Sequence, residues 1–119
     1  MTLRCLIVDD SPHFLGAAHD HLEREGVVVV GVATSSAQAL DQAARLRPDV
    51  ALVDIDLADE SGFELARRLQ QPGRPAVAAV IMISTHAEDD FADLVAASPA
   101  VGFLSKAALS GDAIRDLVG

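Results

Sequence analysis

Polar residues that can do chemistry follow apolar runs at intervals along the chain: Asp9, Asp10, Asp54, Ser84 and Lys106. Three carboxylates brought close together repel one another unless a positive charge lies among them. Carboxylate oxygens suit Mg²⁺, which binds one or two carboxylates and keeps several waters. Lys106 is the only lysine of the chain, and its compact ammonium can bind a carboxylate or phosphoryl oxygen as a point charge. These residue types are the parts of a phosphoryl-transfer site.

In such a site Asp54 is the expected nucleophile, because an aspartate carboxylate can form an acyl phosphate. Mg²⁺ or Mn²⁺, held by Asp10, Asp54 and the backbone carbonyl at Asp56, would neutralise charge on the transferring group. We expect Asp9 to help fix the metal through its waters. The lysine ammonium and the serine hydroxyl would then bind the other phosphoryl oxygens.

The fold must bring these residues to one place. Short apolar runs that end at polar residues predict buried parallel strands over residues 3–8, 27–33, 50–53, 77–83 and 101–104. Apolar residues at helical spacing predict a helix after each strand. The alternation predicts an α/β fold: a flavodoxin-like, doubly wound, five-stranded parallel sheet in the order 2-1-3-4-5 with five helices. The strands' carboxyl ends share one edge, so the polar side chains can converge there.

Helix starts are marked by capping residues. Ser35 with Gln38, and Ser61 with Glu64, have the spacing of a capping box. The acids at 88–90 are expected in the first turn of the fourth helix, where negative charge favours the positive end of the helix dipole.

Composition narrows the class of protein. The 119 residues form one expected domain, and the formal net charge of −9 argues against direct binding of nucleic acid. Cys5 is the only cysteine, so we expect a buried thiol in a reducing cytosol. No apolar segment approaches the roughly 20 residues that span a bilayer, and the N-terminus lacks a signal-peptide pattern. We therefore expect a soluble cytoplasmic protein without membrane association.

Taken together, these features resemble the receiver domain of bacterial two-component response regulators over the entire chain. The residues at the family's relative spacings are Asp9, Asp10, Asp54, Ser84 and Lys106, and Phe103 matches the aromatic switch position. Residues 54–57 and 61–66 are most like receivers of LuxR/NarL-type helix-turn-helix regulators. We expect residues 1–119 to be one receiver domain with no output domain in this chain. Whether it is free-standing or part of a longer protein stays open.

The resemblance implies that a sensor histidine kinase or a phosphotransfer protein supplies the phosphoryl group to Asp54. It also implies that Ser84 and Phe103 move on phosphorylation and remodel the face made by the fourth helix and fifth strand. The domain would then be a signalling phosphoacceptor rather than an enzyme, apart from self-phosphorylation from donors and autodephosphorylation. A homodimer is among the assemblies that the resemblance allows.

Some positions depart from the family pattern. Ala107 stands where the family usually has Pro, so the family's cis peptide is not assumed here. Thr85 stands where Ala or Gly is common, and we expect its bulk to restrict access of a donor or water. Asp56 and His86 occupy positions that tune dephosphorylation in the family. We expect Asp56 to place extra negative charge beside the phosphoryl group.

Other interpretations of the same residues stay open. A receiver-shaped binding module that works without phosphorylation is one, and the departures at Thr85 and Ala107 would permit it. A metal-dependent phosphohydrolase is another, but the short loops leave little room for a substrate pocket. Residue by residue, Asp54 could be a solvated acid after a buried strand, and Phe103 a core residue that never rotates.

Overall fold

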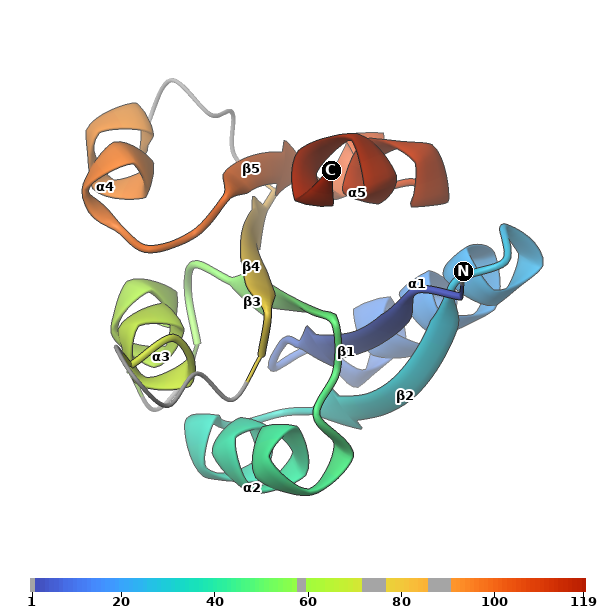
Figure 1. Ribbon diagram of the computed structural model, residues 1–119, viewed down its shortest axis with the longest axis horizontal. Helices are drawn as coiled ribbons and strands as arrows, with labels where there is room; N and C mark the ends of the chain where they lie inside the picture. The colour runs from blue at the N-terminus through green and yellow to red at the C-terminus, as the bar shows by residue number, and fades with distance from the viewer. Residues whose placement is uncertain (1, 58–59, 72–76, 86–90) are drawn as a thin grey trace.

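The computed structural model describes residues 2–57, 60–71, 77–85 and 91–119. Within these residues, five parallel strands form one sheet in the order β2-β1-β3-β4-β5 (Figure 1). The strands are β1 (Arg4–Val8), β2 (Val28–Ala33), β3 (Val50–Asp54), β4 (Ala79–Ser84) and β5 (Gly102–Ser105). The predicted fold class and strand order are confirmed.

Helices cover both faces of the sheet (Figure 1). They are α1 (Pro12–Arg24), α2 (Ser36–Leu46), α3 (Gly62–Leu69), α4 (Ala92–Ala97) and α5 (Gly111–Val118), with a short 3₁₀ turn, η2 (Lys106–Ala108), after β5. One aliphatic core cluster lies beneath α2 and α3, and a second lies beneath α1 and α5. Burial on both faces explains why the three central strands, β1, β3 and β4, are almost entirely apolar up to their last residues.

Side chains satisfy the first N–H groups of these helices where the sequence predicts it. The Ser35 hydroxyl accepts the N–H of Gln38, and the Gln38 side chain accepts the N–H of Thr34, one residue before the expected partner. The Ser61 hydroxyl accepts the N–H of Phe63, while Glu64 pairs with an arginine of its own helix instead of closing the predicted box. The acids at 88–90 lie outside the described residues.

The central strands end in the polar residues that matter for chemistry. Every residue of β3 and β4 is buried, including the terminal Asp54 and Ser84. The fourth strand begins at Ala79, two residues later than predicted, and the Val77 carbonyl before it accepts a hydrogen bond from the Gln70 side chain. The register of the two strands, with Asp54 opposite Ile83, places the carboxyl end of β4 beside that of β3, where the site lies.

Two further sequence-based expectations concern the thiol and the membrane. Cys5 is a free cysteine in the core, and burial raises the pKa of its thiol to about 12. Among the described residues, no helix combines the length and apolar character needed to cross a bilayer.

Candidate phosphoryl-transfer site

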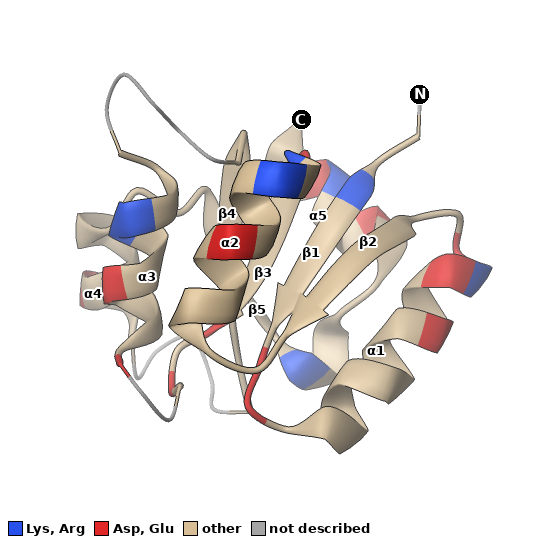
Figure 2. Ribbon diagram, turned by 90° about the horizontal axis from the view of Figure 1, so that it is seen from below, with Lys and Arg blue, Asp and Glu red and all other residues tan. Residues whose placement is uncertain are grey.

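Three carboxylates converge at the carboxyl edge of the sheet. One carboxylate oxygen from each of Asp9, Asp10 and Asp54 lies within 4.8 Å of the others. Figure 2 shows the acidic segment that follows β1 at the edge to which the strand arrows point. Asp9 is fully buried, Asp54 is 7% exposed and Asp10 is exposed. The structure therefore brings together the acids that the sequence placed on two different strands.

Asp9 is oriented by the turn that starts α1. Its Oδ1 atom accepts the backbone N–H of Ser11 at 2.9 Å, and Ser11 in turn caps α1 by accepting the N–H of Phe14 at 3.3 Å. The other oxygen, Oδ2, lies 2.5 Å from Nζ of Lys106 but has no aligned hydrogen bond among the described residues. The Lys106 ammonium is the partner of this oxygen, since a lysine ammonium can rotate its three N–H groups toward a carboxylate.

Lys106 reaches this edge from the first residue of η2. Its ammonium lies 3.5 Å from Oδ2 of Asp54 and 2.5 Å from Oδ2 of Asp9, and its side chain is 16% exposed. Burial lowers the pKa of Lys106, but the hydrogen bonds and charges of the two acids outweigh it and the net pKa is raised. The ammonium is therefore held in its charged form as the positive partner of the acids.

Asp54 lies in an environment that disfavours its charge. Burial, together with the negative charge of Asp9, raises its pKa to about 6, although the N–H of Asp56 and the charge of Lys106 oppose the shift. The Asp56 N–H donates to Oδ1 of Asp54 at 3.2 Å. A cation bound beside Asp54 would favour its ionised form, because a nearby positive charge lowers the pKa of a carboxyl group.

The donor set fits a hard divalent cation. All three converging side chains offer carboxylate oxygens, and oxygen ligands of this kind suit Mg²⁺ or Ca²⁺. The Asp56 side chain is exposed and lies outside this group of oxygens. A metal contact through its backbone carbonyl stays a prediction.

The expected switch residues lie on the two neighbouring strands β4 and β5. Ser84 is buried and pairs in register with Ser105 at the ends of β4 and β5. Phe103 is 8% exposed and pairs with Met82 in the core cluster beneath α2 and α3. Thr85 is exposed. The motion of these residues on phosphorylation stays a prediction, and His86 lies outside the described residues.

The loop that carries Lys106 differs from the family pattern as the sequence indicates. The described peptide bonds, including Lys106–Ala107, are all trans. The Ser105 hydroxyl accepts the N–H of Ala108 and so fixes the turn that presents the lysine.

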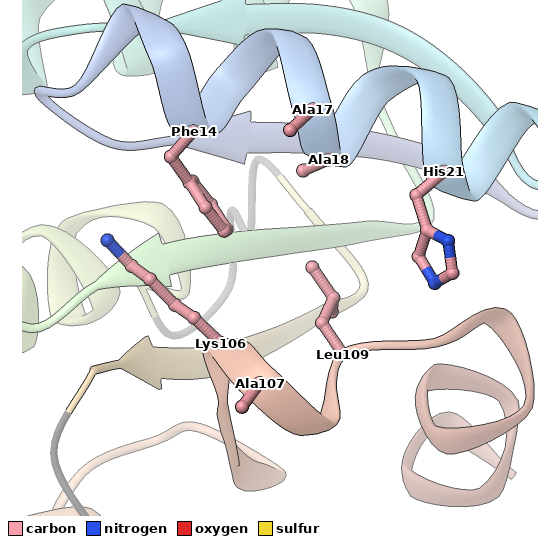
Figure 3. Close-up of a pocket in the computed structure, with 7 residues that line it drawn as sticks. All are labelled: Phe14, Ala17, Ala18, His21, Lys106, Ala107 and Leu109. Carbon is pink, nitrogen blue, oxygen red and sulfur yellow. The ribbon is translucent and has the colours of Figure 1, made fainter.

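Sequence reasoning missed Phe14. Its ring lies below the ammonium of Lys106, with 4.4 Å between Nζ and the ring centroid. Both residues line a cavity of about 340 Å³ between α1 and η2, which extends along the helix to His21 (Figure 3). A signal was present in the sequence, because Phe14 lies in the first turn of the helix that begins directly after the acids.

The fold and this acidic edge define a doubly wound α/β domain with a polar site at the carboxyl ends of its strands. Residues 5–118 match the family described as the response regulator receiver domain. The chain belongs to this family, whose members act in two-component signalling with histidine kinases or phosphotransfer proteins and typically use Mg²⁺.

Individual relatives agree with this assignment. The signal receiver domain of the putative response regulator NarL from Mycobacterium tuberculosis is 29% identical, with a TM-score of 0.85 over 98% of this chain and 96% of that one. A response regulator protein from Burkholderia pseudomallei is 25% identical, with a TM-score of 0.79 over 98% of this chain and 66% of the other. That structure is described as having a phosphorylated aspartic acid, calcium ion and citrate.

Among curated proteins, a protein-glutamate methylesterase/protein-glutamine glutaminase from Syntrophus aciditrophicus is 35% identical over 83% of this chain and 29% of its own length. This chain spans about half or less of the length of the first curated relatives that it matches. The shared part is the receiver domain, so activities of the longer relatives are not carried over to this chain.

Proposed function

We propose that Asp54 accepts a phosphoryl group from a sensor histidine kinase or phosphotransfer protein, with Mg²⁺ or Mn²⁺ bound by Asp9, Asp10 and Asp54. One observation carries the proposal: three carboxylates converge within 4.8 Å, and the Lys106 ammonium lies 3.5 Å from Asp54. The phosphorylated aspartic acid and calcium ion of the Burkholderia pseudomallei protein support the same chemistry. We place the reaction in the cytoplasm.

In the proposed reaction, a carboxylate oxygen of Asp54 attacks the phosphorus of the donor. The bond between phosphorus and the donor nitrogen or oxygen breaks, its electron pair stays with the donor, and an acyl phosphate forms. A bound divalent cation would supply neutralisation of the charge on the phosphoryl oxygens. Asp54 must be ionised to attack, and with its pKa near 6 it is mostly carboxylate at neutral pH.

Lys106 and Ser84 would bind the phosphoryl group once it is on Asp54. Lys106 would hold one phosphoryl oxygen, and the Ser84 hydroxyl at the end of the neighbouring strand would hold another. In this proposal Ser84 and Phe103 then shift and remodel the face made by α4 and β5, which changes partner binding, homodimer formation or the state of an output domain. Because the chain carries a net charge of −9, we propose that the direct partners of this domain are proteins and not nucleic acids.

Incubation with acetyl phosphate or a phosphoramidate and Mg²⁺, followed by intact-mass analysis and peptide mapping, tests the function. We expect one phosphoryl adduct in wild type and none in Asp54→Asn. The matched control Asp41→Asn removes an exposed aspartate of α2 and should keep the adduct. No adduct in wild type would favour a binding module that works without phosphorylation. Steady multiple turnover of the donor would favour a phosphohydrolase.

A further inference from the structure

The Lys106 ammonium has an uncharged partner as well as two acids. Its Nζ atom lies 4.4 Å from the centroid of the Phe14 ring. Figure 3 shows the two side chains reaching toward each other, Phe14 from α1 and Lys106 from the start of η2. At this distance the negative face of an aromatic ring attracts a cation, and the attraction grows when water is excluded. Lys106 is mostly shielded from solvent, at 16% side-chain exposure.

Phe14 is itself held firmly. The Ser11 hydroxyl accepts its backbone N–H, and Ser11 also donates its own N–H to Asp9. The ring packs against the core cluster beneath α1 and α5. One helix start therefore orients both the buried acid and the aromatic ring that meet the lysine ammonium.

The two kinds of partner respond differently to a change of charge at the site. The attraction between Lys106 and its acids falls when their charge is neutralised, whether by a bound divalent cation or by formation of an acyl phosphate on Asp54. The attraction of the Phe14 ring does not depend on the charge of the acids. Phe14 can therefore retain the ammonium beside Asp54 when its strongest ionic partner, Asp9, is engaged elsewhere.

We propose that Phe14 is a positioning residue for Lys106, holding the ammonium over its ring so that it stays within reach of a phosphoryl group on Asp54. This inference rests on the proposed function for its effect on the phosphorylation rate, but the contact between Phe14 and Lys106 can be tested separately. The expected loss on removing the ring is about three- to tenfold in the rate of phosphorylation at saturating Mg²⁺, the scale of a partly desolvated cation–π contact.

The contact can be read directly, because Lys106 is the only lysine of the chain. Protein labelled with isotopic lysine gives a single lysine spin system in NMR. We expect the ring current of Phe14 to move the methylene protons next to Nζ upfield of their position in denatured protein, both with EDTA and with Mg²⁺. Phe14→Leu, which keeps an apolar side chain, should abolish the displacement. Phe14→Tyr, which keeps the ring, should restore it.

Phe63→Leu is the matched control, since Phe63 packs in the other core cluster. It should leave the lysine resonance where it is in wild type. An unchanged lysine resonance in Phe14→Leu would overturn the proposal, as would a displacement lost with Mg²⁺ in wild type. A phosphorylation rate in Phe14→Leu equal to wild type, or one that Phe14→Tyr fails to restore, would equally overturn it. Absence of any adduct in wild type would instead refute the proposed function, while the resonance still decides the contact.

Discussion

The ammonium of Lys106 lies closer to Asp9 than to Asp54, at 2.5 Å from the first carboxylate and 3.5 Å from the second. Asp9, the fully buried acid that directly follows β1, is therefore the main ionic partner of the lysine, and the proposed phosphoacceptor Asp54 is the lesser one. Asp9 can therefore pair with Lys106 or contribute to binding a cation, and the two interactions compete for the same carboxylate.

Replacing Asp9 should weaken metal binding more than replacing an exposed acid that lies away from the site. Asp9→Asn removes one of three converging negative charges, and we expect the Mg²⁺ dissociation constant to rise about tenfold or more, the usual scale for loss of a metal-supporting group. Isothermal titration calorimetry with Mg²⁺ measures it. Asp20→Asn, on the exposed face of α1, should bind Mg²⁺ as wild type does; an equal weakening in both variants would mean that only overall charge matters.

The raised pKa of Asp54 predicts a pH-dependent stability in EDTA. Below the ordinary pKa of 3.8 the carboxyl is protonated in both the folded and unfolded states and destabilises neither. As pH rises through the folded-state pKa of about 6, the folded state bears the full cost of the buried charge, so stability falls. Asp54→Asn should thus raise the free energy of unfolding by about 1–3 kcal/mol at pH 7.5, and by little at pH 4.

Urea denaturation of both proteins across this pH range provides the measurement. Asp41→Asn serves as the reference because Asp41 is largely exposed. A stabilisation of Asp54→Asn that grows toward acid would have the wrong sign for this account.

The start of α3 should tolerate no side chain at Gly62. A Cβ atom there would lie 2.0 Å from the backbone oxygen of Asp54, which cannot move without shifting the end of β3. We expect Gly62→Ala to lower the free energy of unfolding by about 3 kcal/mol and to slow phosphorylation. Gly16→Ala is the counterpart in α1, where the new Cβ would meet nothing within 4 Å. It should stabilise by about 0.5–1 kcal/mol, as thermal or urea unfolding can show; equal effects of both changes would contradict the geometry.

β2 is an edge strand of the sheet, and we predict that the side chains of Glu23 and Gln42 protect it from pairing with a strand of another chain. Residues 27–33 contain neither a charge nor a proline, a composition that favours association at an exposed edge. The Glu23 carboxylate accepts the N–H of Val29 at 2.7 Å, and the Gln42 amide donates to the carbonyl of Val32 at 2.8 Å. We expect the double change Glu23→Ala with Gln42→Ala to increase self-association in sedimentation velocity runs.

The control for that experiment is Asp20→Ala, which removes one charge from α1 as Glu23→Ala does but has no bond to β2. Asp20→Ala should show no more self-association in sedimentation velocity runs than wild type does. A double variant that sediments as wild type would show that the two side chains do not protect the edge.

Much of this architecture could be predicted because the central strands carry two sequence signals, an apolar run and a polar residue at its end. The central strands β3 and β4 are apolar runs buried along their whole length, and each ends in a polar residue, Asp54 and Ser84. Right-handed crossovers then leave few sheet orders, and the observed order is the expected one. Convergence of Asp9, Asp10, Asp54 and Lys106 follows from that topology, since strand ends share an edge.

What could not be predicted depends on side-chain reach. The spacing of the residues does not show that Lys106 approaches Asp9 more closely than Asp54, or that the Phe14 ring meets the ammonium. Both contacts depend on side-chain conformations and on the local hydrogen bonds of Ser11 to Asp9 and Phe14. Likewise, Glu64 pairs with Arg67 although its spacing predicted a capping box. Competition between nearby polar partners decides such contacts. The sequence shows which residues could take part but not which pair forms.

Chemical trapping on Asp54 tests the central claim most directly. Borohydride reduces an acyl phosphate to an alcohol, so protein treated with acetyl phosphate and Mg²⁺ and then reduced should carry homoserine at position 54 in peptide mass spectra. We predict this conversion in wild type, its loss when EDTA replaces Mg²⁺, and no converted residue elsewhere in the chain. Conversion at a different acid, or none at any acid under conditions where the donor is intact, would contradict the account.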